Sequence, residues 1–133
     1  MAIFLIAILI WSIIVIHISL TNDFSKTPFG MEKNDGKNSG YFFLNNIFLP
    51  KLNCTKEMIS IDLDCDYGLG SSFLTGAFSL IVREINPTTQ NFYTFNEIQS
   101  RVIFFDSSDL FSRDVISIWE YMKEIEEQSK NNI

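Results

Sequence analysis

The stretch from Ile59 to Glu84 constrains the fold most, because it reads as a strand, a glycine-containing turn and a helix in immediate succession. At its start, apolar and polar residues alternate over eight positions. The apolar members are Ile59, Ile61, Leu63 and Cys65, and the polar members are Ser60, Asp62, Asp64 and Asp66. A period of two predicts a strand with one buried face and one solvated face.

A turn and a helix follow the predicted strand. Gly68 and Gly70 allow backbone angles that other residues resist, so the chain can turn sharply there. Ser71 or Ser72 can cap the next helix, since a serine hydroxyl accepts a hydrogen bond from a free backbone N–H of the first turn. An apolar stripe at helical spacing predicts the helix face that packs on the sheet, and Asn86-Pro87 is expected to end this helix. The stripe consists of Leu74, Ala77, Phe78, Ile81 and Ile85.

Before this central unit, the sequence predicts a strand, a loop and a helix. Alternating apolar residues predict a first strand over residues 17–22. The polar stretch Thr27–Asn38 is expected to be a loop, and its Asp35-Gly36 pair favours the turn of a short hairpin. Ser39 is a candidate N-cap for a helix of about ten residues, which Pro50 is expected to end or kink.

After the central unit, the sequence predicts two helices and another strand. Thr94 and Glu97 form a capping-box pattern that predicts the start of a short helix. The continuous apolar run Val102–Phe105 is typical of an inner strand that is covered on both faces. From Ser112 to Ser129 the spacing predicts a long amphipathic helix. Its apolar face carries Val115, Ile118, Trp119, Met122 and Ile125, and its charged face carries Glu120, Lys123, Glu124 and Glu127.

Together these elements predict one domain of α/β or mixed α+β layer class. A chain of 133 residues fits a single domain. We expect a small mixed sheet of about three to five strands with helices packed mainly on one face. The domain is expected to span residues 16–129, with residues 130–133 as a frayed tail.

Residues 1–16 are almost wholly apolar, and three interpretations of them stay open. A membrane anchor needs about 20 apolar residues, whereas the first strand leaves residues 1–15, a helix of only about 22 Å. A signal peptide needs a basic start and a small-residue cleavage site, and neither is visible before Asp23. The run could instead be a non-native start or an extension of the first strand. A cytoplasmic location is therefore the main expectation, and membrane association is the secondary one.

Composition excludes several classes of function. The net charge is −6 and the ten basic residues are scattered, so nucleic-acid binding is not expected. His17 is the single histidine, which rules out paired imidazoles for catalysis or metal binding, and it is expected to be a hydrogen-bonded strand residue. Cys54 and Cys65 lack the spacing of a secreted scaffold and are expected to be reduced thiols.

Chemical motifs point away from an enzyme. Asp62, Asp64 and Asp66 would stand about 7 Å apart on one face of the predicted strand, but oxygen-only metal sites usually draw their ligands from converging loops. No nucleophile elbow, phosphate-binding Walker loop or metal-ligand cluster is present in the sequence. We therefore expect no catalytic residue, no metal and no cofactor.

Several motifs follow one another in an order known from one family. In the central unit they are I-D-L-D at residues 61–64, G-x-G-S-S-F-L at 68–74, A-F at 77–78 and V-R-E at 82–84. In the first half they are Asp23-Phe24-Ser25, Thr27-Pro28, Gly30, Asp35-Gly36, Ser39-Gly40, Phe43 and Leu49-Pro50. Over roughly residues 16–125 the chain resembles the STAS-like family, which is related in fold to bacterial anti-sigma-factor antagonists. It departs from the family at Met31 and Leu44, where arginines are expected, and at Cys65 and Leu69, where glycine and tyrosine are expected.

The resemblance implies a non-catalytic regulatory module that binds a partner protein. In anti-sigma-factor antagonists, a serine of the matching turn accepts phosphate from a kinase of the histidine-kinase-like ATPase fold, and the matching positions here are Ser71 and Ser72. The expected partner is such an ATPase or a serine kinase. The candidate site for the phosphate or the partner consists of Gly68, Gly70, Ser71, Ser72 and Phe73, the last in place of the glycine that the antagonists have after the two serines. An alternative is a small-ligand or nucleotide sensor that binds an anion at the same helix N-terminus, and a further one tethers either form to a membrane.

Overall fold

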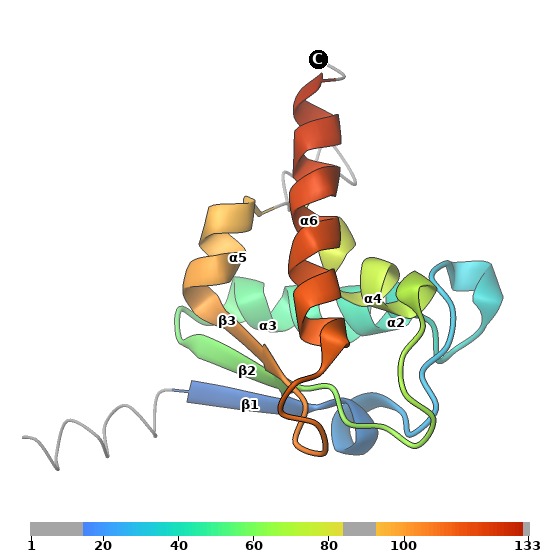
Figure 1. Cartoon of the computed structure of the whole chain (residues 1–133). Coiled ribbons are helices and arrows are strands. Elements are labelled where there is room, and N and C mark those ends of the chain that lie inside the picture. The colour runs from blue at the N-terminus through green and yellow to red at the C-terminus, as the bar shows by residue number, and fades with distance from the viewer. Residues whose placement is uncertain (1–14, 84–92, 132–133) are drawn as a thin grey trace, which may run out of the picture.

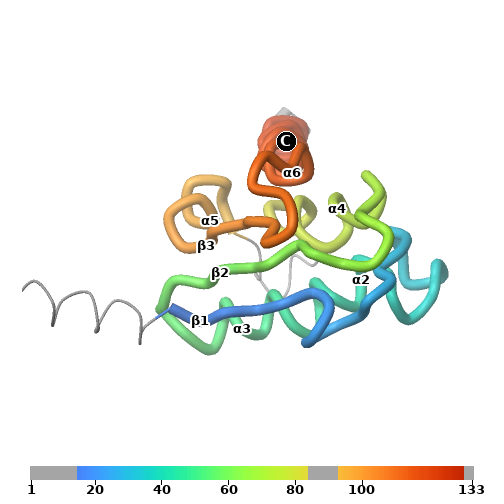
Figure 2. Tube along the Cα trace, turned by 60° about the horizontal axis from the view of Figure 1, so that its bottom comes forward, coloured from blue at the N-terminus to red at the C-terminus, as the bar shows by residue number. Residues whose placement is uncertain are grey.

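The computed structural model describes residues 15–83 and 93–131, and in them three strands form one parallel sheet (Figure 1). The strands are β1 (Val15–Ser19), β2 (Met58–Asp62) and β3 (Val102–Phe105), and their order in the sheet is the order in the chain (Figure 2). Helices make up the rest of the regular structure. The predicted α/β class with a small sheet is therefore confirmed. The described sheet is wholly parallel instead of mixed, because a helical crossover connects each strand to the next.

Helical segments connect the strands and follow the last one. The connection from β1 to β2 contains a π turn η1 (Leu20–Phe24), a 3-10 turn η2 (Lys33–Asp35), α2 (Gly40–Phe43), a π turn η3 (Leu44–Phe48) and α3 (Leu49–Cys54). The connection from β2 to β3 contains α4 (Ser71–Ala77), a 3-10 turn η4 (Ser79–Val82) and α5 (Phe95–Arg101). The long helix α6 (Arg113–Asn131) comes after β3.

The helices pack on one face of the sheet. Successive strands step across the sheet in one direction, and right-handed crossovers then place every connection on the same side. Phe104 on β3 shows the result, because its ring lies 6.2 Å from that of Phe48, 5.1 Å from that of Phe78 and 5.1 Å from that of Trp119. Segments from both crossovers and from α6 thus meet the same side chain of the sheet.

The strand register divides the sheet side chains into two sets. The set beneath the helices is Ile16, Ile18, Ile59, Ile61, Val102 and Phe104. The opposite set is His17, Ser19, Ser60, Asp62, Ile103 and Phe105. Ile103 is 46% exposed, so the prediction that β3 is covered on both faces is wrong. The apolar run has one buried and one open face, because the described helices pack on the side of the sheet that carries Val102 and Phe104.

The central strand also differs from its prediction. β2 ends at Asp62, so Asp64 and Asp66 lie in the following loop. Ser60 is buried although it belongs to the polar set, because it lies between its neighbours on β1 and β3 and its hydroxyl hydrogen-bonds to Nδ1 of His17. His17 is thus the hydrogen-bonded strand residue that the sequence predicts.

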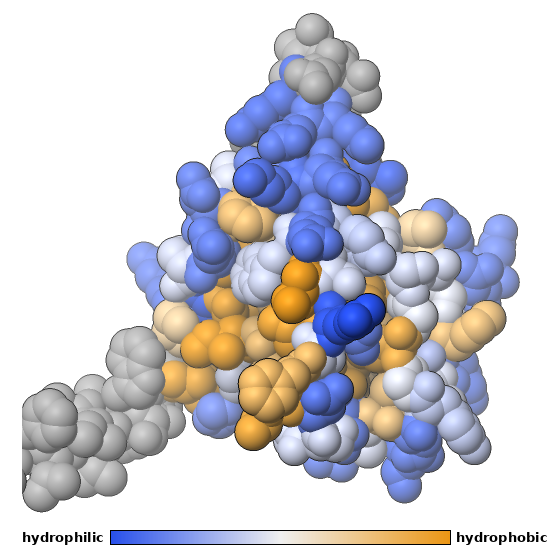
Figure 3. All heavy atoms as spheres, viewed as in Figure 1, coloured by the Kyte–Doolittle hydropathy of each residue, from blue (hydrophilic) through white to orange (hydrophobic). Residues whose placement is uncertain are grey.

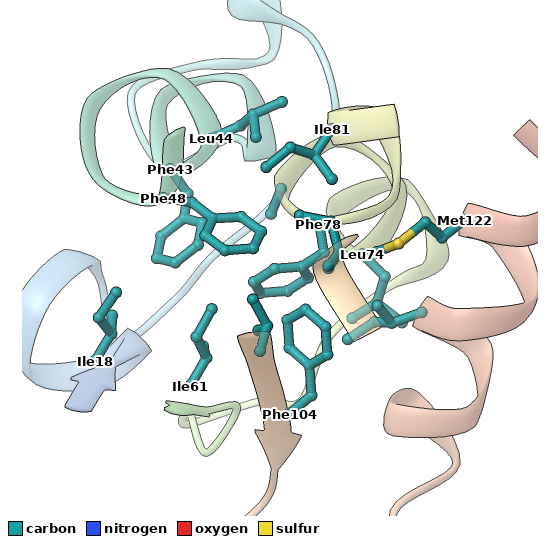
Figure 4. Close-up of a cluster of buried hydrophobic side chains, with 14 of the residues drawn as sticks. Ile18, Phe43, Leu44, Phe48, Ile61, Leu74, Phe78, Ile81, Phe104 and Met122 are labelled. Atoms are coloured by element: carbon teal, nitrogen blue, oxygen red, sulfur yellow. The ribbon is translucent and has the colours of Figure 1, made fainter. Parts of the chain in front are cut away.

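Aromatic rings fill the space between sheet and helices (Figure 4). Phe43, Phe48 and Phe78 are fully buried, and the rings of Phe43 and Phe78 lie 5.2 Å apart in an edge-to-face arrangement. Such pairs add about 0.5–1.5 kcal/mol beyond the burial of their area. Phe78 also reaches Phe104 on the sheet, so it links the first crossover, the second crossover and β3.

The single helix predicted after the turn forms two separate segments in the structure. The stripe residues described by the structure, Leu74, Ala77, Phe78 and Ile81, are buried as predicted. However, α4 ends at Ala77, Phe78 leaves helical geometry at φ −125° and ψ −51°, and the 3-10 turn η4 follows. The break also turns Ser79 inward, where its hydroxyl donates to the carbonyl of Ile118 at 3.0 Å. Tertiary packing overrides the helical pattern here, and Ile85 and Asn86-Pro87 lie outside the described residues.

Three local predictions in the first half are wrong. The first strand ends at Ser19 instead of Asn22, because the Ser19 hydroxyl accepts from the Asn22 backbone and starts a π turn. Asp35-Gly36 closes the 3-10 turn η2 rather than a hairpin, since the Asp35 carboxylate binds the backbone N–H groups of Met31 and Glu32.

The third concerns Pro50, because the helix does not end there but continues to Cys54. The preceding π turn η3 widens the helix, and Leu49 N–H donates five residues back to Leu44. This wider turn accommodates a proline that an α-helix would reject. Ser39 does occupy the predicted N-cap position of α2, although its hydroxyl makes no cap hydrogen bond.

Two predictions in the second half are confirmed. Thr94 and Glu97 form the reciprocal capping box of α5. α6 buries Ile118 and Met122 and exposes its charged face. The prediction that the tail begins at residue 130 is wrong, because α6 continues to Asn131. Residues 132–133 and the apolar N-terminal run up to residue 14 lie outside the described part. Within residues 15–83 and 93–131, no helix combines the length and apolar character needed to cross a bilayer.

Two glycines bring α2 against α4, a contact that no pattern in the sequence predicts. A Cβ on Gly40 would lie 2.4 Å from the backbone nitrogen of Ala77, and one on Gly76 would lie 2.8 Å from the carbonyl oxygen of Met31. Larger side chains would force these backbones apart. The contact fixes the C-terminal end of α4 against α2 and against the loop that precedes α2.

We expect Phe78→Ala to lower the free energy of unfolding by about 3–5 kcal/mol, because it removes the ring that joins three elements of the core. Urea unfolding followed by circular dichroism measures this loss. Phe29→Ala is the matched control, since Phe29 is 75% exposed and should lose less than about 1 kcal/mol. Equal losses in the two variants would contradict this description of the core.

Candidate functional site

The turn after β2 has the sharp bend that the sequence predicts, but not the predicted helix cap. Gly68 has a φ of +75°, which favours glycine, whereas Gly70 has an ordinary φ of −84°. Gly70 is the N-cap of α4, and no side chain caps this helix. The prediction that Ser71 or Ser72 is the cap is therefore wrong, since the extended backbone of Gly70 already starts the helix one residue earlier.

The five predicted site residues divide between surface and core. Gly68, Gly70, Ser71 and Ser72 are exposed. Phe73 is fully buried, and its ring lies 6.0 Å from that of Phe78. Phe73 cannot contact a partner, but it anchors the first turn of α4 and so fixes the position of the two serines.

Hydrogen bonds tie the loop before the serines to the N-terminal half of the chain. The hydroxyl of Thr21 donates to the carbonyl of Asp64 at 2.7 Å, and the N–H of Asp66 donates to the carbonyl of Lys26 at 3.0 Å. The position of the turn thus depends on distant parts of the chain, since Thr21 and Asp64 are 43 positions apart.

A shallow hollow of about 310 Å³ lies beside the serines. Its lining residues are Phe29, Gly30, Asp35, Gly70, Ser71, Ser72 and Phe73. Asp35 is the single charged residue of this lining, and its carboxylate accepts from Met31 and Glu32 at 3.0 and 2.9 Å. No basic side chain in the described lining would neutralise an anion there. Leu44, where the family has arginine, is buried in the core.

Asp62 organises the loops at the carboxyl end of the sheet. Its Oδ1 accepts from the backbone N–H of Asp64 at 3.1 Å and of Ser107 at 3.0 Å. Burial raises the pKa of Asp62, but the hydrogen bonds from Ser107 and Asp64 outweigh burial and hold the pKa below its ordinary value. The ionised carboxylate therefore joins the loop after β2 to the loop after β3.

The row of three aspartates expected on the strand does not form, because only Asp62 belongs to β2. Within residues 15–83 and 93–131, no three side chains of His, Cys, Asp or Glu come together as a metal site. Cys54 and Cys65 are both free thiols. Burial raises the pKa of Cys65, so its reactive thiolate is disfavoured.

The loops after β2 and β3 enclose a second hollow of about 580 Å³, which the sequence analysis did not predict. The carboxyl ends of parallel strands are the usual place for binding sites in open α/β sheets. The available signal in the sequence was an apolar pair, Leu110-Phe111, in the otherwise polar stretch from Asp106 to Arg113. Residues of this loop line the hollow together with Asp64 and Cys65.

Comparisons of this chain with protein-family models, with curated proteins and with solved structures find no match. The resemblance to the STAS-like family stays a prediction.

We expect Asp62→Asn to lower stability at pH 7 and to matter less in acid. The lowered pKa means that ionised Asp62 contributes stability above the ordinary carboxyl pKa of about 3.9 and loses it as the pH falls through the folded-state value. Urea unfolding of parent and variant at pH 7 and at pH 3 measures both differences. The amide keeps the acceptor oxygen, so the comparison isolates the charge. Asp66→Asn, at an exposed position of the same loop, is the control.

A loss for Asp62→Asn that is equally large at both pH values would contradict the role of its charge. The smaller loss in acid is expected because, below the ordinary carboxyl pKa of about 3.9, the unfolded parent chain binds a proton at Asp62 that the lowered pKa of the folded chain disfavours.

Proposed function

We propose that this chain is a non-catalytic regulatory module that docks a partner protein through the turn Gly68–Ser72. The observation that carries the proposal is the position of Ser71 and Ser72. Both are exposed, yet both stand on a helix turn that the buried ring of Phe73 holds in place. An exposed turn that is anchored by a buried ring offers polar groups to a partner at a reduced ordering cost on binding.

The resemblance to the STAS-like family supports the choice of partner. By this analogy the partner is an ATPase of the histidine-kinase-like fold or a serine kinase. Either hydroxyl is accessible to a kinase, since neither is engaged in capping α4. A phosphate adds almost two negative charges and three acceptor oxygens to the turn.

Phosphorylation would change the docked complex more than the isolated domain. The first backbone N–H groups of α4 and its dipole favour negative charge at Ser71 and Ser72. A partner that covers the turn would instead bury this charge close to the carboxylate of Asp35, which shares the hollow beside the serines. The modified turn would therefore release the partner, as in a partner-switching module.

An anion or nucleotide sensor at the same turn is the alternative, and the site supports it less. The one charged group in the described lining of the hollow is the Asp35 carboxylate, which repels an anion. Titrating the pure protein with nucleotides tests this alternative directly. Membrane tethering of either form depends on residues 1–14, which lie outside the described part.

We expect Ser72→Asp to weaken capture of the partner by at least about tenfold, equivalent to 1.4 kcal/mol, while the melting temperature stays within a few degrees. Tagged parent and variant chains capture partners from the host cell, and quantitative mass spectrometry compares the yields. Ser72→Asn is the matched control, because it has nearly the same shape without the charge and should retain the partner.

Ser71→Asp belongs in the same experiment, since both serines are exposed. The switch is absent if both aspartate variants capture the same partners as the parent chain does. Loss of capture in Ser72→Asn as well would assign the effect to shape instead of charge.

A further inference from the structure

The loop between β3 and α6 presents an exposed apolar surface. Leu110 is 86% exposed, Phe111 is 91% exposed, and Ile116 on the first turn of α6 is 58% exposed. With Phe105 they line a hollow of about 540 Å³. Figure 3 shows the apolar surface gathered at the foot of α6. We call these four residues the apolar foot.

The loop holds its apolar pair outward by its own hydrogen bonds. The N–H of Ser108 donates to the Asp106 carboxylate at 3.0 Å, and the N–H of Phe111 donates to the Asp109 carboxylate at 3.1 Å. The N–H of Ser112 donates to the Asp109 carbonyl at 3.2 Å. Leu110 and Phe111 therefore lie on a hydrogen-bonded turn with their side chains exposed. Neither side chain belongs to the core.

Carboxylates border the apolar foot. The apolar hollow and the hollow at the carboxyl end of the sheet share Asp106, Asp109, Phe111, Ser112 and Arg113. The second hollow adds Asp64 and Asp114. Burial first, and then the charges of Asp106 and Asp109, raise the pKa of Asp114, which reports a negative potential at this position. Arg113 is the one basic residue in the described lining of the two hollows.

We propose that this surface docks a basic amphipathic segment of a partner protein. Its apolar side chains would cover the apolar foot, and its lysines or arginines would face Asp106, Asp109 and Asp114. Charge complementarity with an acidic border selects such a segment and speeds its encounter with the protein. The inference goes beyond the proposed function, because Ser71 and Ser72 line a different hollow.

Charge also argues against three other occupants. Residues 1–14 of the chain contain no charged side chain that could pair with the aspartates. A second copy would bring the same acidic border against itself across a two-fold axis. An anionic lipid surface would be repelled by the same carboxylates.

The test uses two fluorescent 18-residue helical peptides with the same leucine face, one with lysines and one with glutamates on the opposite face. Fluorescence anisotropy with the full chain should show saturable binding of the lysine peptide and none of the glutamate peptide. The double variant Leu110→Ser/Phe111→Ser should weaken binding of the lysine peptide at least tenfold. Asp106→Asn/Asp109→Asn should weaken it as well, and both effects should be accompanied by unchanged circular dichroism.

Phe29→Ser is the matched control, because it removes an aromatic ring that is 75% exposed in the hollow beside the serines. It should leave peptide binding unchanged. Because the apolar foot and the turn Gly68–Ser72 line different hollows, the peptide experiment can refute this proposal without refuting the proposed docking through the turn. Equal binding of the two peptides, or a loss in Phe29→Ser as large as in the double variant, would overturn the proposal. So would undiminished binding by the double variant.

Two further measurements address the other occupants. Sedimentation velocity should give the same mass for the parent and the double variant, and a parent dimer that the double variant dissociates would assign the surface to a second copy. Mixed phosphatidylcholine and phosphatidylglycerol vesicles should show no difference between the parent chain and the double variant, because the carboxylates repel the anionic lipid from this surface. A loss of vesicle binding confined to the double variant would assign the surface to lipid and overturn the proposal.

Discussion

The one-sided sheet is the constraint on which the structure depends. Three parallel strands follow one another in chain order, so right-handed crossovers place all helices on the same face. A single layer of apolar side chains must then join sheet and helices, and clustered phenylalanines fill it. Phe78 is placed where both crossovers and β3 meet, and the break between α4 and η4 occurs at this residue. The packing of one ring therefore explains an irregularity of the backbone.

Local patterns were sufficient for the elements whose hydrogen bonds are local. A few neighbouring residues determine the capping box at Thr94 and the two faces of α6, and the structure confirms both predictions. The open face of β3 could not be predicted in this way, because an apolar run has the same appearance whether one or both of its faces are covered. Which face of the sheet the helices cover is a property of the whole chain. The helix similarly continues through Pro50 because a π turn precedes it, and no sequence pattern predicts this π turn.

The candidate site was predictable in part for the same reason. Glycine at a positive φ is a local requirement, and Gly68 meets it. The role of Asp62 is non-local, because one of its hydrogen bonds comes from a loop 45 residues later. The acidic border at the foot of α6 draws on Asp64 as well as on Asp106 and Asp114, so it exists only after β2 and β3 pair. The sequence shows the separate aspartates but not their convergence.

The strand pairing also has a kinetic consequence. His17 and Ser60, which are paired across β1 and β2, are 43 residues apart in the chain, and both ladders join strands separated by a whole crossover. A chain must close such long loops before any sheet hydrogen bond forms, whereas α6 can form from contacts within a few residues. Refolding should therefore be limited by assembly of the sheet. In the interval before assembly, the apolar strands are unpaired, and the early chain is most exposed to association with other unfolded chains.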